Sequence, residues 1–426
     1  MKYIDRRQFL ISIGGATAAI GLPVTGFGKS GGARVVVVGG GFGGATCARY
    51  LRALDASLDV TLVTAEAKFV TCPFSNLVLG GMLDMASITH GYDGLKAAGV
   101  KVVVGRATAV DGAKREVKLA NGDALAFDRA VVSPGIDIKY GAIDGYDEKA
   151  SASMPHAWQA GPQTELLRQQ LTAMDDGGLV IIAAPANPFR CPPGPYERAS
   201  LIAHYLKENK PKSKVLLLDA KDKFSKQGLF MQGWEQLYPG MIEWVKGSEG
   251  GIVERVDAGS NLLVTESGFT EHKGAVVNFI PPQQAASVAR DSGLTDDSGW
   301  CPVNQMTFES TQVPGVHVIG DASIAGKMPK SGFSANSQGK VCATAVAALL
   351  RGETPSTPSY ANTCYSLVGP EYGISVSAVY RHGEQGIAGV EGAGGVSPAD
   401  AGPEFREAEA SYARGWYSSI SADIWG

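Results

Sequence analysis

The chain has 426 residues, of which 44% are hydrophobic and 19% are charged, and its formal net charge is −4. Because this length exceeds what one hydrophobic core usually organises, we expect a folded, soluble chain of two or three domains. The negative charge argues against nucleic acid as a partner. Beyond the N-terminus the chain has no apolar run of about 18 residues, so we expect no integral membrane segment in the mature chain.

The N-terminal segment predicts an export signal. Arg6 and Arg7 precede a mildly apolar, Gly- and Ala-rich stretch over residues 11–27, which is typical of a twin-arginine signal. That route carries proteins that are already folded, so it suits a chain that acquires a cofactor in the cytoplasm. We therefore expect residues 1–33 to be a twin-arginine signal peptide and the mature protein to be periplasmic.

A glycine loop follows the first predicted strand. The apolar run Arg34–Val38 is typical of a strand buried in a parallel sheet, and Gly39, Gly41 and Gly44 form a G-x-G-x-x-G motif before a helical pattern over residues 45–54. Such a turn lets backbone N–H groups approach a pyrophosphate at the helix N-terminus. The motif predicts a dinucleotide-binding domain.

Two acidic residues are candidate ligands of that dinucleotide. The predicted strand Asp59–Thr64 ends in threonine where a ribose-binding acid is expected, and Glu66 follows two residues later. Asp321 comes directly after another apolar strand, in the sequence Val-Ile-Gly-Asp. An aspartate in that place commonly binds a ribityl hydroxyl in flavoproteins, so it favours FAD over NAD.

A second strand-turn-helix unit departs from the nucleotide pattern. An apolar strand pattern over residues 178–184 leads into a turn with several prolines and Cys191, and a helical pattern follows over residues 196–207. Proline supplies no backbone N–H for a phosphate. This unit predicts a nucleotide-type domain that has lost its nucleotide and gained a thiol.

The six cysteines differ in their surroundings. Cys72, Cys191 and Cys364 lie in turns rich in Pro, Asn or aromatic residues, where an inert thiol is less expected. The other three are predicted to be structural: Cys47, Cys301 and Cys342. The chain has no C-x-x-C-H motif for a c-type haem and no cysteine pair with zinc spacing, and its six histidines are scattered, so we expect no metal site.

Several segments carry a family resemblance together: residues 71–76, 90–95, 188–200, 320–324, 328–332, 334–340 and 358–366. In these segments the chain resembles the flavoprotein subunit of flavocytochrome c sulfide dehydrogenase, a relative of the sulfide:quinone oxidoreductases. The likeness extends from about residue 33 to residue 426.

The resemblance implies roles for particular residues. Cys72 would hold FAD covalently as a thioether, and Cys191 and Cys364 would form a redox-active disulfide beside the flavin. Glu197 would transfer protons near that disulfide. Trp416 would lie between the flavin and a c-type cytochrome subunit, the implied heterodimer partner.

The chemistry of this arrangement can be argued independently of the resemblance. A disulfide is an electrophile for hydrosulfide, which attacks one sulfur and leaves a persulfide and a thiolate. A neighbouring flavin can accept the resulting electron pair and release electrons singly to haem. Because the second nucleotide turn is blocked by prolines, the electrons are expected to leave through another protein.

The expected fold is α/β, with two Rossmann-like dinucleotide-binding-type domains in a glutathione-reductase-like arrangement and a C-terminal interface domain. We predict a discontinuous FAD-binding domain over residues 34–140 and 255–350, and a second Rossmann-like domain without NAD over residues 141–254. The interface domain would cover residues 351–426, with a Gly- and Pro-rich surface loop over residues 389–403.

These features predict a periplasmic sulfide dehydrogenase flavoprotein that passes electrons to a c-type cytochrome. Three alternatives stay open: a flavoprotein serving a Sox-type system, a membrane-associated sulfide:quinone oxidoreductase, and a non-catalytic flavin-binding relay. The charged and aromatic segment over residues 404–417 favours a protein partner over a membrane. The retained pair Cys191 and Cys364 argues against a non-catalytic relay.

Overall fold

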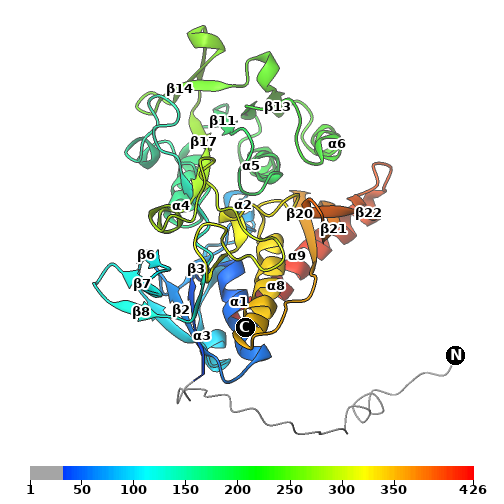
Figure 1. The fold of residues 1–426 in the computed structure, drawn as a ribbon. Coiled ribbons are helices and arrows are strands. Elements are labelled where there is room, and N and C mark those ends of the chain that lie inside the picture. Colours follow the sequence, from blue (N-terminus) through cyan, green and yellow to red (C-terminus); the bar gives the residue numbers. More distant parts are fainter. Residues whose placement is uncertain (1–31) are drawn as a thin grey trace, which may run out of the picture. The chain divides into compact units, whose positions relative to one another are not determined.

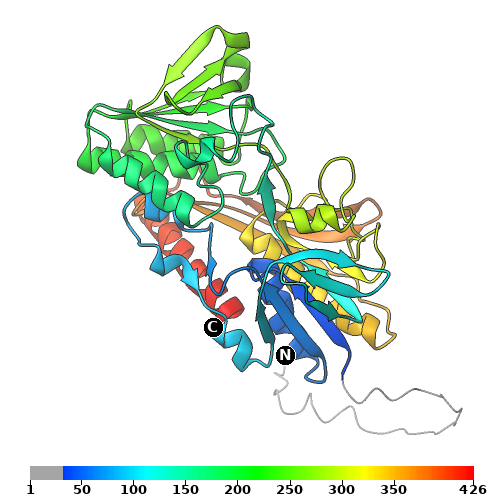
Figure 2. The same cartoon turned by 90° about the vertical axis from the view of Figure 1, so that its left-hand side faces the viewer.

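The computed structural model of the protein describes residues 32–426, and residues 33–426 form one compact unit. The predicted twin-arginine segment lies outside the described residues. Figures 1 and 2 show the second domain (green) at one end of this unit and the first domain (blue, cyan and yellow) at the other.

The first domain is built on a parallel sheet that draws strands from distant parts of the chain. Its order is β19 (Val316–Val318), β9 (Arg129–Val132), β1 (Arg34–Val38), β2 (Asp59–Thr64) and β5 (Lys101–Val104). Every neighbouring pair is parallel. The first strand in the sequence lies in the middle, as in Rossmann domains. The valines of β1 are all buried, because a parallel sheet is covered on both faces.

Two helices of this domain pack closely against each other, α1 (Phe42–Leu54) and α8 (Gly332–Leu350). A Cβ at Gly339 of α8 would lie 2.7 Å from the carbonyl oxygen of Gly43, so only glycine allows this approach. The buried thiols of Cys47 and Cys342 lie in the same interface, in agreement with their predicted packing role.

Smaller elements complete the first domain. An antiparallel sheet consists of β6 (Ala107–Asp111), β7 (Glu116–Leu119) and β8 (Ala124–Ala126). Short elements lie between β2 and β5: β3 (Phe69–Val70), α2 (Ser75–Leu79), β4 (Thr89–His90) and α3 (Asp93–Ala97). The helix α7 (Ser287–Asp291) contacts β6.

The second domain has a parallel sheet of the same type. Its order is β13 (Ile242–Val245), β12 (Lys214–Asp219), β11 (Leu179–Ala184) and β17 (Val276–Phe279). Its helices are α4 (Pro162–Ala173), α5 (Gly194–Asn209) and α6 (Gln227–Leu237), and an antiparallel meander is formed by β14 (Val253–Asp257), β15 (Leu262–Thr265) and β16 (Thr270–Lys273).

The pairing of β17 corrects one predicted boundary. Residues 255–279 were assigned to the first domain, but β17 pairs in parallel with β11 and belongs to the second sheet. The apolar strand at 276–279 could join either sheet by its pattern alone, and only the pairing decides it. The chain returns afterwards through β18 (Gln283–Ala285), which pairs antiparallel with the outgoing strand β10 (Ile136–Ile138).

The C-terminal region is an antiparallel sheet followed by a long helix. Its strands are β20 (Ser359–Gly369), β21 (Tyr372–Gly383) and β22 (Gly386–Val396), and its helix is α9 (Pro403–Trp425). The loop predicted over residues 389–403 was therefore wrong for residues 389–396, which extend β22 along β21. Glycine-rich edge strands give a weak sequence signal because backbone pairing rather than side-chain burial holds them.

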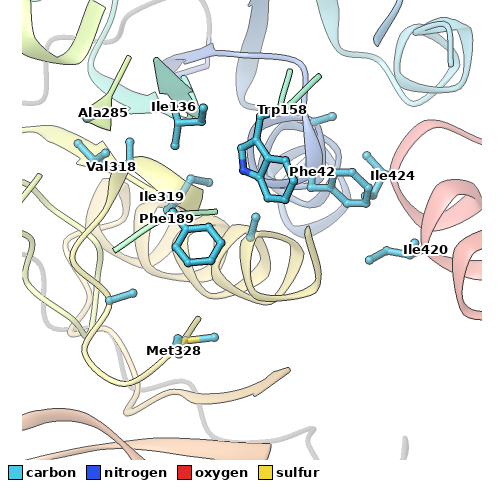
Figure 3. Close-up of a cluster of buried hydrophobic side chains, with 14 of the residues drawn as sticks. Phe42, Ile136, Trp158, Phe189, Ala285, Val318, Ile319, Met328, Ile420 and Ile424 are labelled. Atoms are coloured by element: carbon cyan, nitrogen blue, oxygen red, sulfur yellow. The ribbon is translucent and has the colours of Figure 1, made fainter. Parts of the chain in front are cut away.

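The helix α9 brings the end of the chain back to the first domain. In Figure 2 it runs (red) beside the blue and cyan elements, and it contacts α1 and α3. The Trp425 ring stacks on Phe69 with centroids 5.4 Å apart and meets the edge of Phe42 at 5.2 Å. Figure 3 shows Phe42, Trp158 and Ile424 among the side chains of the main buried cluster, which therefore joins all three regions.

Candidate active site

One pocket gathers most of the residues singled out in the sequence. A cavity of about 90 Å³ is lined by Cys72, Cys191, Cys364, Glu197 and Trp416, among others. These residues come from the first domain, the second domain and the C-terminal region, so the pocket lies where the three meet. Each of the six cysteines is a free thiol in the structure, and the link between Cys191 and Cys364 stays a prediction.

Cys191 lies in the turn between β11 and α5. Its backbone is left-handed, with φ at 59°, a conformation that costs a residue with a side chain about 1–3 kcal/mol. The turn is held because Cys191 N donates to Lys330 O (2.8 Å) and Cys191 O accepts from Gly194 N (2.8 Å). Burial raises the pKa of the Cys191 thiol, and the neighbouring negative groups of Cys364 and Glu197 raise it further.

Cys72 lies in the turn between β3 and α2. The hydroxyl of the preceding Thr71 is 2.7 Å from the Tyr417 hydroxyl of α9, and the Ser75 hydroxyl donates to Cys72 O (2.7 Å). The Cys72 thiol lies 3.6 Å from the Trp158 carbonyl oxygen. The turn is thus tied to the C-terminal helix on one side and to the pocket wall on the other.

Cys364 lies within β20, opposite Val376 of β21. The Asn362 amide is 3.4 Å from the Cys364 sulfur. The same amide group accepts hydrogen bonds from Ser331 (2.6 Å) and Ser334 (3.0 Å) at the start of α8. Cys364 is therefore anchored to the N-terminus of a first-domain helix, which favours negative charge nearby.

Glu197 lies in the first turn of α5. Its carboxylate accepts hydrogen bonds from the Asn76 amide (2.8 Å) and the Leu367 backbone N–H (2.8 Å). Burial raises the pKa of Glu197, although these two hydrogen bonds oppose the shift. A carboxyl group in the same pocket as the thiols can give and take protons there.

Arg198 is a functional residue that the sequence analysis did not single out. It is 2% exposed, and its guanidinium donates to Asn76 Oδ1 (3.0 Å), Asn278 Oδ1 (2.8 Å), His156 O (3.1 Å) and Ala157 O (2.7 Å). Burial lowers the pKa of Arg198 to about 10. Its sequence signal was its place in the segment 188–200, directly after Glu197, and a single basic residue in a helix with other charged residues is not specific.

His156 completes this network. Its Nδ1 accepts the backbone N–H of Trp158 (3.0 Å), and its Nε2 lies 3.3 Å from the Tyr140 hydroxyl. Burial and the charges of Arg198 and Arg190 lower the pKa of His156 to about 4. The neutral ring thus orients the segment that carries Trp158, one wall of the pocket.

The turn between β1 and α1 has the geometry of a dinucleotide site. Gly39 has φ at 103°, a left-handed conformation that favours glycine. A Cβ at Gly44 would collide with the Gly39 carbonyl oxygen, and a Cβ at Gly41 would lie 3.0 Å from the Phe69 ring. Gly39 is thus required by backbone conformation and Gly44 by space, Gly41 is tightly packed, and the helix α1 begins directly after Gly41.

The corresponding site of the second domain is filled by its own side chains. Asp219, fully buried at the end of β12, lies where a Rossmann domain would bind ribose. It accepts hydrogen bonds from the Tyr196 hydroxyl (2.6 Å), the Trp244 indole (3.1 Å) and Lys221 (2.5 Å). The Tyr196 ring also stacks on Phe224 with centroids 3.6 Å apart. The acidic residue is therefore fully used within the domain.

Trp416 lies on α9 at the edge of the pocket. Its ring is parallel to Phe333 of α8, with centroids 6.4 Å apart, and lies 6.3 Å from the Tyr365 ring of β20. Its indole Nε1 is buried and has no hydrogen-bond partner within residues 32–426. Three aromatic rings, of Trp416, Phe333 and Tyr365, thus lie side by side in the pocket lining.

Within residues 32–426 none of the helices is both long and apolar enough to cross a membrane. In that same range, no three His, Cys, Asp or Glu side chains gather into a possible metal site.

Three family descriptions match successive parts of the chain. Residues 33–175 match the pyridine nucleotide-disulphide oxidoreductases, residues 164–281 the central region of the sulfide dehydrogenase (flavocytochrome c) flavoprotein chain, and residues 356–425 the flavin-binding region of flavocytochrome c sulphide dehydrogenase. A stretch of 45 residues, 11% of this chain, is 71% identical to the sulfide dehydrogenase (flavocytochrome c) flavoprotein chain of Chlorobaculum thiosulfatiphilum and covers 94% of that sequence. The chain belongs to this family of flavoprotein chains. The recognition made from the sequence motifs is confirmed.

More distant relatives share the fold. The mitochondrial sulfide:quinone oxidoreductase of Mus musculus is 20% identical over 294 residues, which are 68% of this chain and 65% of that protein. The solved sulfide:quinone oxidoreductase of Aquifex aeolicus superposes with a TM-score of 0.70 at 16% identity, covering 92% of each chain. A putidaredoxin reductase in a covalent complex with putidaredoxin gives 0.65 at 19% identity. The flavoprotein is thus an FAD-binding oxidoreductase with two dinucleotide-type domains.

The first domain fits FAD. The glycine turn provides the close backbone approach that a pyrophosphate needs. Asp321 follows β19, and its Oδ1 is buried without a hydrogen-bond partner in residues 32–426, while its Oδ2 lies 3.8 Å from Arg190. An unpartnered buried carboxylate oxygen is costly unless a ligand hydroxyl donates to it. Burial raises the pKa of Asp321, because the ionised carboxylate loses contact with water there.

The ribose end of the site is less sharply defined. Thr64, at the end of β2, is buried, and its hydroxyl lies 3.0 Å from the Tyr92 hydroxyl. Glu66 is exposed in the following turn, yet its charge contributes to raising the pKa of Tyr92. The contact of Glu66 with a ribose stays a prediction.

Acid should lower the stability of the folded protein through His156, which supports the wall of the pocket. The folded pKa of His156, about 4, lies below its ordinary value of 6.5, so between these values the unfolded chain binds a proton that the folded chain does not. We expect the free energy of unfolding to fall as the pH drops from about 6.5 to about 4, by up to about 1.4 kcal/mol per pH unit. His156→Asn keeps a hydrogen-bond acceptor and should flatten this slope.

Chemical denaturation at stepped pH measures the slope, with His382→Asn in the C-terminal hairpin as the control. An equal slope in wild type and His156→Asn would show that another group is responsible.

Proposed function

We propose that this chain is the flavoprotein subunit of a periplasmic sulfide dehydrogenase. It oxidises sulfide at a disulfide between Cys191 and Cys364 beside FAD, and it passes the electrons to a c-type cytochrome subunit. The observation that carries the proposal is the meeting of Cys72, Cys191, Cys364 and Glu197 in one pocket between three regions of the fold.

The proposed sulfur step uses the two cysteines as a disulfide. Hydrosulfide attacks one sulfur, a new S–S bond forms in a persulfide, and the bond between Cys191 and Cys364 breaks. The negative charge of hydrosulfide moves to the sulfur that leaves as a thiolate. Glu197, held by Asn76 and Leu367 beside these sulfurs, would take the proton that remains on the attacking sulfur.

FAD, when bound, accepts electrons in pairs and releases them singly, which is the exchange that a disulfide and a haem require. Gly39, Gly41 and Gly44 would admit its pyrophosphate, Glu66 its ribose and Asp321 its ribityl chain. Cys72 would hold it covalently, because the Cys72 turn opens into the same pocket as the other two thiols.

The electron acceptor is proposed to be a protein and not a nicotinamide. The ribose-binding place of the second domain is filled by Asp219 and its three internal donors. Trp416 extends from the pocket beside Phe333 and Tyr365, so it would carry electrons toward a cytochrome docked on the C-terminal region. The twin-arginine pattern at residues 6–7 supports a periplasmic location, where c-type cytochromes are found.

A quinone-reducing enzyme is the second candidate, because sulfide:quinone oxidoreductases share the fold. The likeness at 16–20% identity concerns the fold alone. The C-terminal helix α9 begins with the charged sequence Glu-Phe-Arg-Glu, which suits a protein partner better than the apolar surface of a membrane. A Sox-type partner would use the same site.

The two cysteines of the proposed disulfide provide the main test. Cys191→Ser and Cys364→Ser should each reduce sulfide-dependent flavin reduction to background, because neither variant can form the electrophile. Flavin absorbance in stopped flow measures the rate. Both variants should retain FAD, and Cys301→Ala, which removes a buried thiol outside the pocket, should react like the wild type. A serine variant with the wild-type rate would exclude the disulfide mechanism.

Cys72 should hold the flavin covalently. We expect acid precipitation of the loaded wild-type protein to leave yellow colour in the pellet, whereas Cys72→Ser should release its flavin into the supernatant. Flavin fluorescence of both fractions measures the distribution. A colourless wild-type pellet would contradict the covalent link without affecting the sulfur chemistry.

Trp416 should affect the transfer of electrons from the flavin to the cytochrome. In Trp416→Ala we expect slower reduction of cytochrome c and unchanged reduction of the flavin by sulfide, because the aromatic path is interrupted after the flavin. Trp416→Phe, which keeps a ring, should retain most of the rate. Stopped-flow spectra with sulfide, cytochrome c and NADH distinguish the steps. Rapid flavin reduction by NADH would instead indicate a pyridine-nucleotide oxidoreductase.

A further inference from the structure

A buried lysine lies behind the strand that carries Cys364. Lys226 is 7% exposed, and its ammonium donates to Cys364 O (2.9 Å) and Ser366 Oγ (2.8 Å) and reaches Ile374 O at 3.5 Å. It therefore connects β20 and β21 from the side of the second domain. The sequence analysis gave this residue no role.

The backbone and the helix dipole at Lys226 make this position unfavourable for a cation. Its backbone is left-handed, with φ at 61°, and it is the N-cap residue of α6, where the helix dipole disfavours positive charge. Burial adds a desolvation cost and lowers the pKa of Lys226 to about 8. A residue kept in such a place needs a compensating negative group.

Most of the groups whose negative charge would raise the pKa of Lys226 line the active-site pocket. They are Cys364 of β20, Glu197 of α5 and Cys191 in the turn before α5, and Glu409 of α9 lies outside the pocket lining. The Phe230 ring of α6 lies 5.7 Å away. Within residues 32–426 no carboxylate lies within 4 Å of the ammonium, so Lys226 has no fixed ion-pair partner there.

Lys210 shows what a purely structural buried lysine looks like in this protein. It is 8% exposed, and its ammonium donates to three carbonyl oxygens at the C-terminal end of α4, those of Leu171, Thr172 and Met174. A cation is favoured there by the helix dipole. Lys226 has the opposite relation to its helix, so helix capping does not explain it.

We propose that Lys226 is a positioning residue that supplies the positive charge for a thiolate at Cys364. The inference rests on the proposed function. Hydrosulfide attacks the Cys191 sulfur, an S–S bond forms there as the bond to Cys364 breaks, and the negative charge of hydrosulfide ends on Cys364. The Lys226 ammonium then stabilises this negative charge, and the thiolate is the form that donates an electron pair.

The surroundings of the two sulfurs agree with this assignment. Burial and nearby negative groups raise the pKa of the Cys191 thiol, so Cys191 is the poorer place for the charge. The titratable or polar groups that face Cys364 are Lys226, Cys191, Tyr380 and the Asn362 amide. Lys226 is the only cation among these four.

Alkylation of the reduced, FAD-loaded protein tests the proposal. The full chain is reduced with a phosphine, freed of reductant and pulsed with iodoacetamide from pH 5 to pH 10, and peptide mass spectrometry quantifies the product at Cys364. The variants are Lys226→Met, which removes the charge at similar volume, and Lys226→Arg, which keeps it. Lys210→Met is the matched control for loss of a buried lysine.

We expect Lys226→Met to raise the pH midpoint of Cys364 alkylation by at least about one unit, the low end of the shift caused by a nearby opposite charge. Lys226→Arg should stay near the wild type, and Lys210→Met should keep the wild-type midpoint even if its melting temperature falls. If Lys226→Met does not fold, Lys226→Gln, which retains a donor for the carbonyls, carries the same expectation.

An unchanged midpoint in a folded, uncharged Lys226 variant would overturn the proposal and leave Lys226 with a structural role. The measurement needs neither sulfide nor an electron acceptor. A shifted midpoint in a protein that does not oxidise sulfide would therefore reject the proposed function and leave the charge role of Lys226 standing.

Discussion

The active site depends on one buried guanidinium, that of Arg198. Its donors hold Asn76 after the Cys72 turn, the carbonyls of residues 156 and 157 in the pocket wall, and Asn278 in the second sheet. Arg198 itself lies in the first turns of α5, just after Cys191 and Glu197. Because these segments share Arg198 as a donor, and Asn76 also donates to Glu197, one buried hydrogen-bond network connects the Cys72 and Cys191 turns.

The second domain keeps a nucleotide-type fold in which the acid at the strand end is bound by its own side chains. Its sheet has one strand fewer than that of the first domain, and Asp219 ends the second strand, where Tyr196, Trp244 and Lys221 donate to its carboxylate. These side chains could not move away without leaving the buried Asp219 unpaired. The domain presents Cys191 in the turn before α5.

Local patterns predicted the strands and turns that depend on sequence-adjacent residues. The bounds of β1 and β2 and the need for Gly39 and Gly44 follow from apolar periodicity and from turn geometry, both local properties. Strand pairing between distant parts of the chain could not be predicted from local patterns. The strand β17 pairs with β11 of the second sheet, and the glycine-rich strand β22 pairs with β21 through backbone hydrogen bonds. Arg198 and Lys226 were missed for the same reason. Their partners lie far away in the sequence, and a single basic residue carries no periodic signal.

The pocket brings acidic groups and buried cations together. Three cysteines and Glu197 are gathered in the pocket, and in the proposed reaction the negative charge of hydrosulfide moves to the Cys364 sulfur. Arg198 and Lys226 are the buried cations that interact with them, Arg198 with Cys72, Cys191 and Glu197, and Lys226 with Cys364, Glu197 and Cys191. Each cation also binds backbone carbonyls, so its place does not change when a thiol gains or loses a proton. Cations that are already in place lower the free-energy cost of moving negative charge between groups in the pocket, because no side chain has to reorganise as the charge moves.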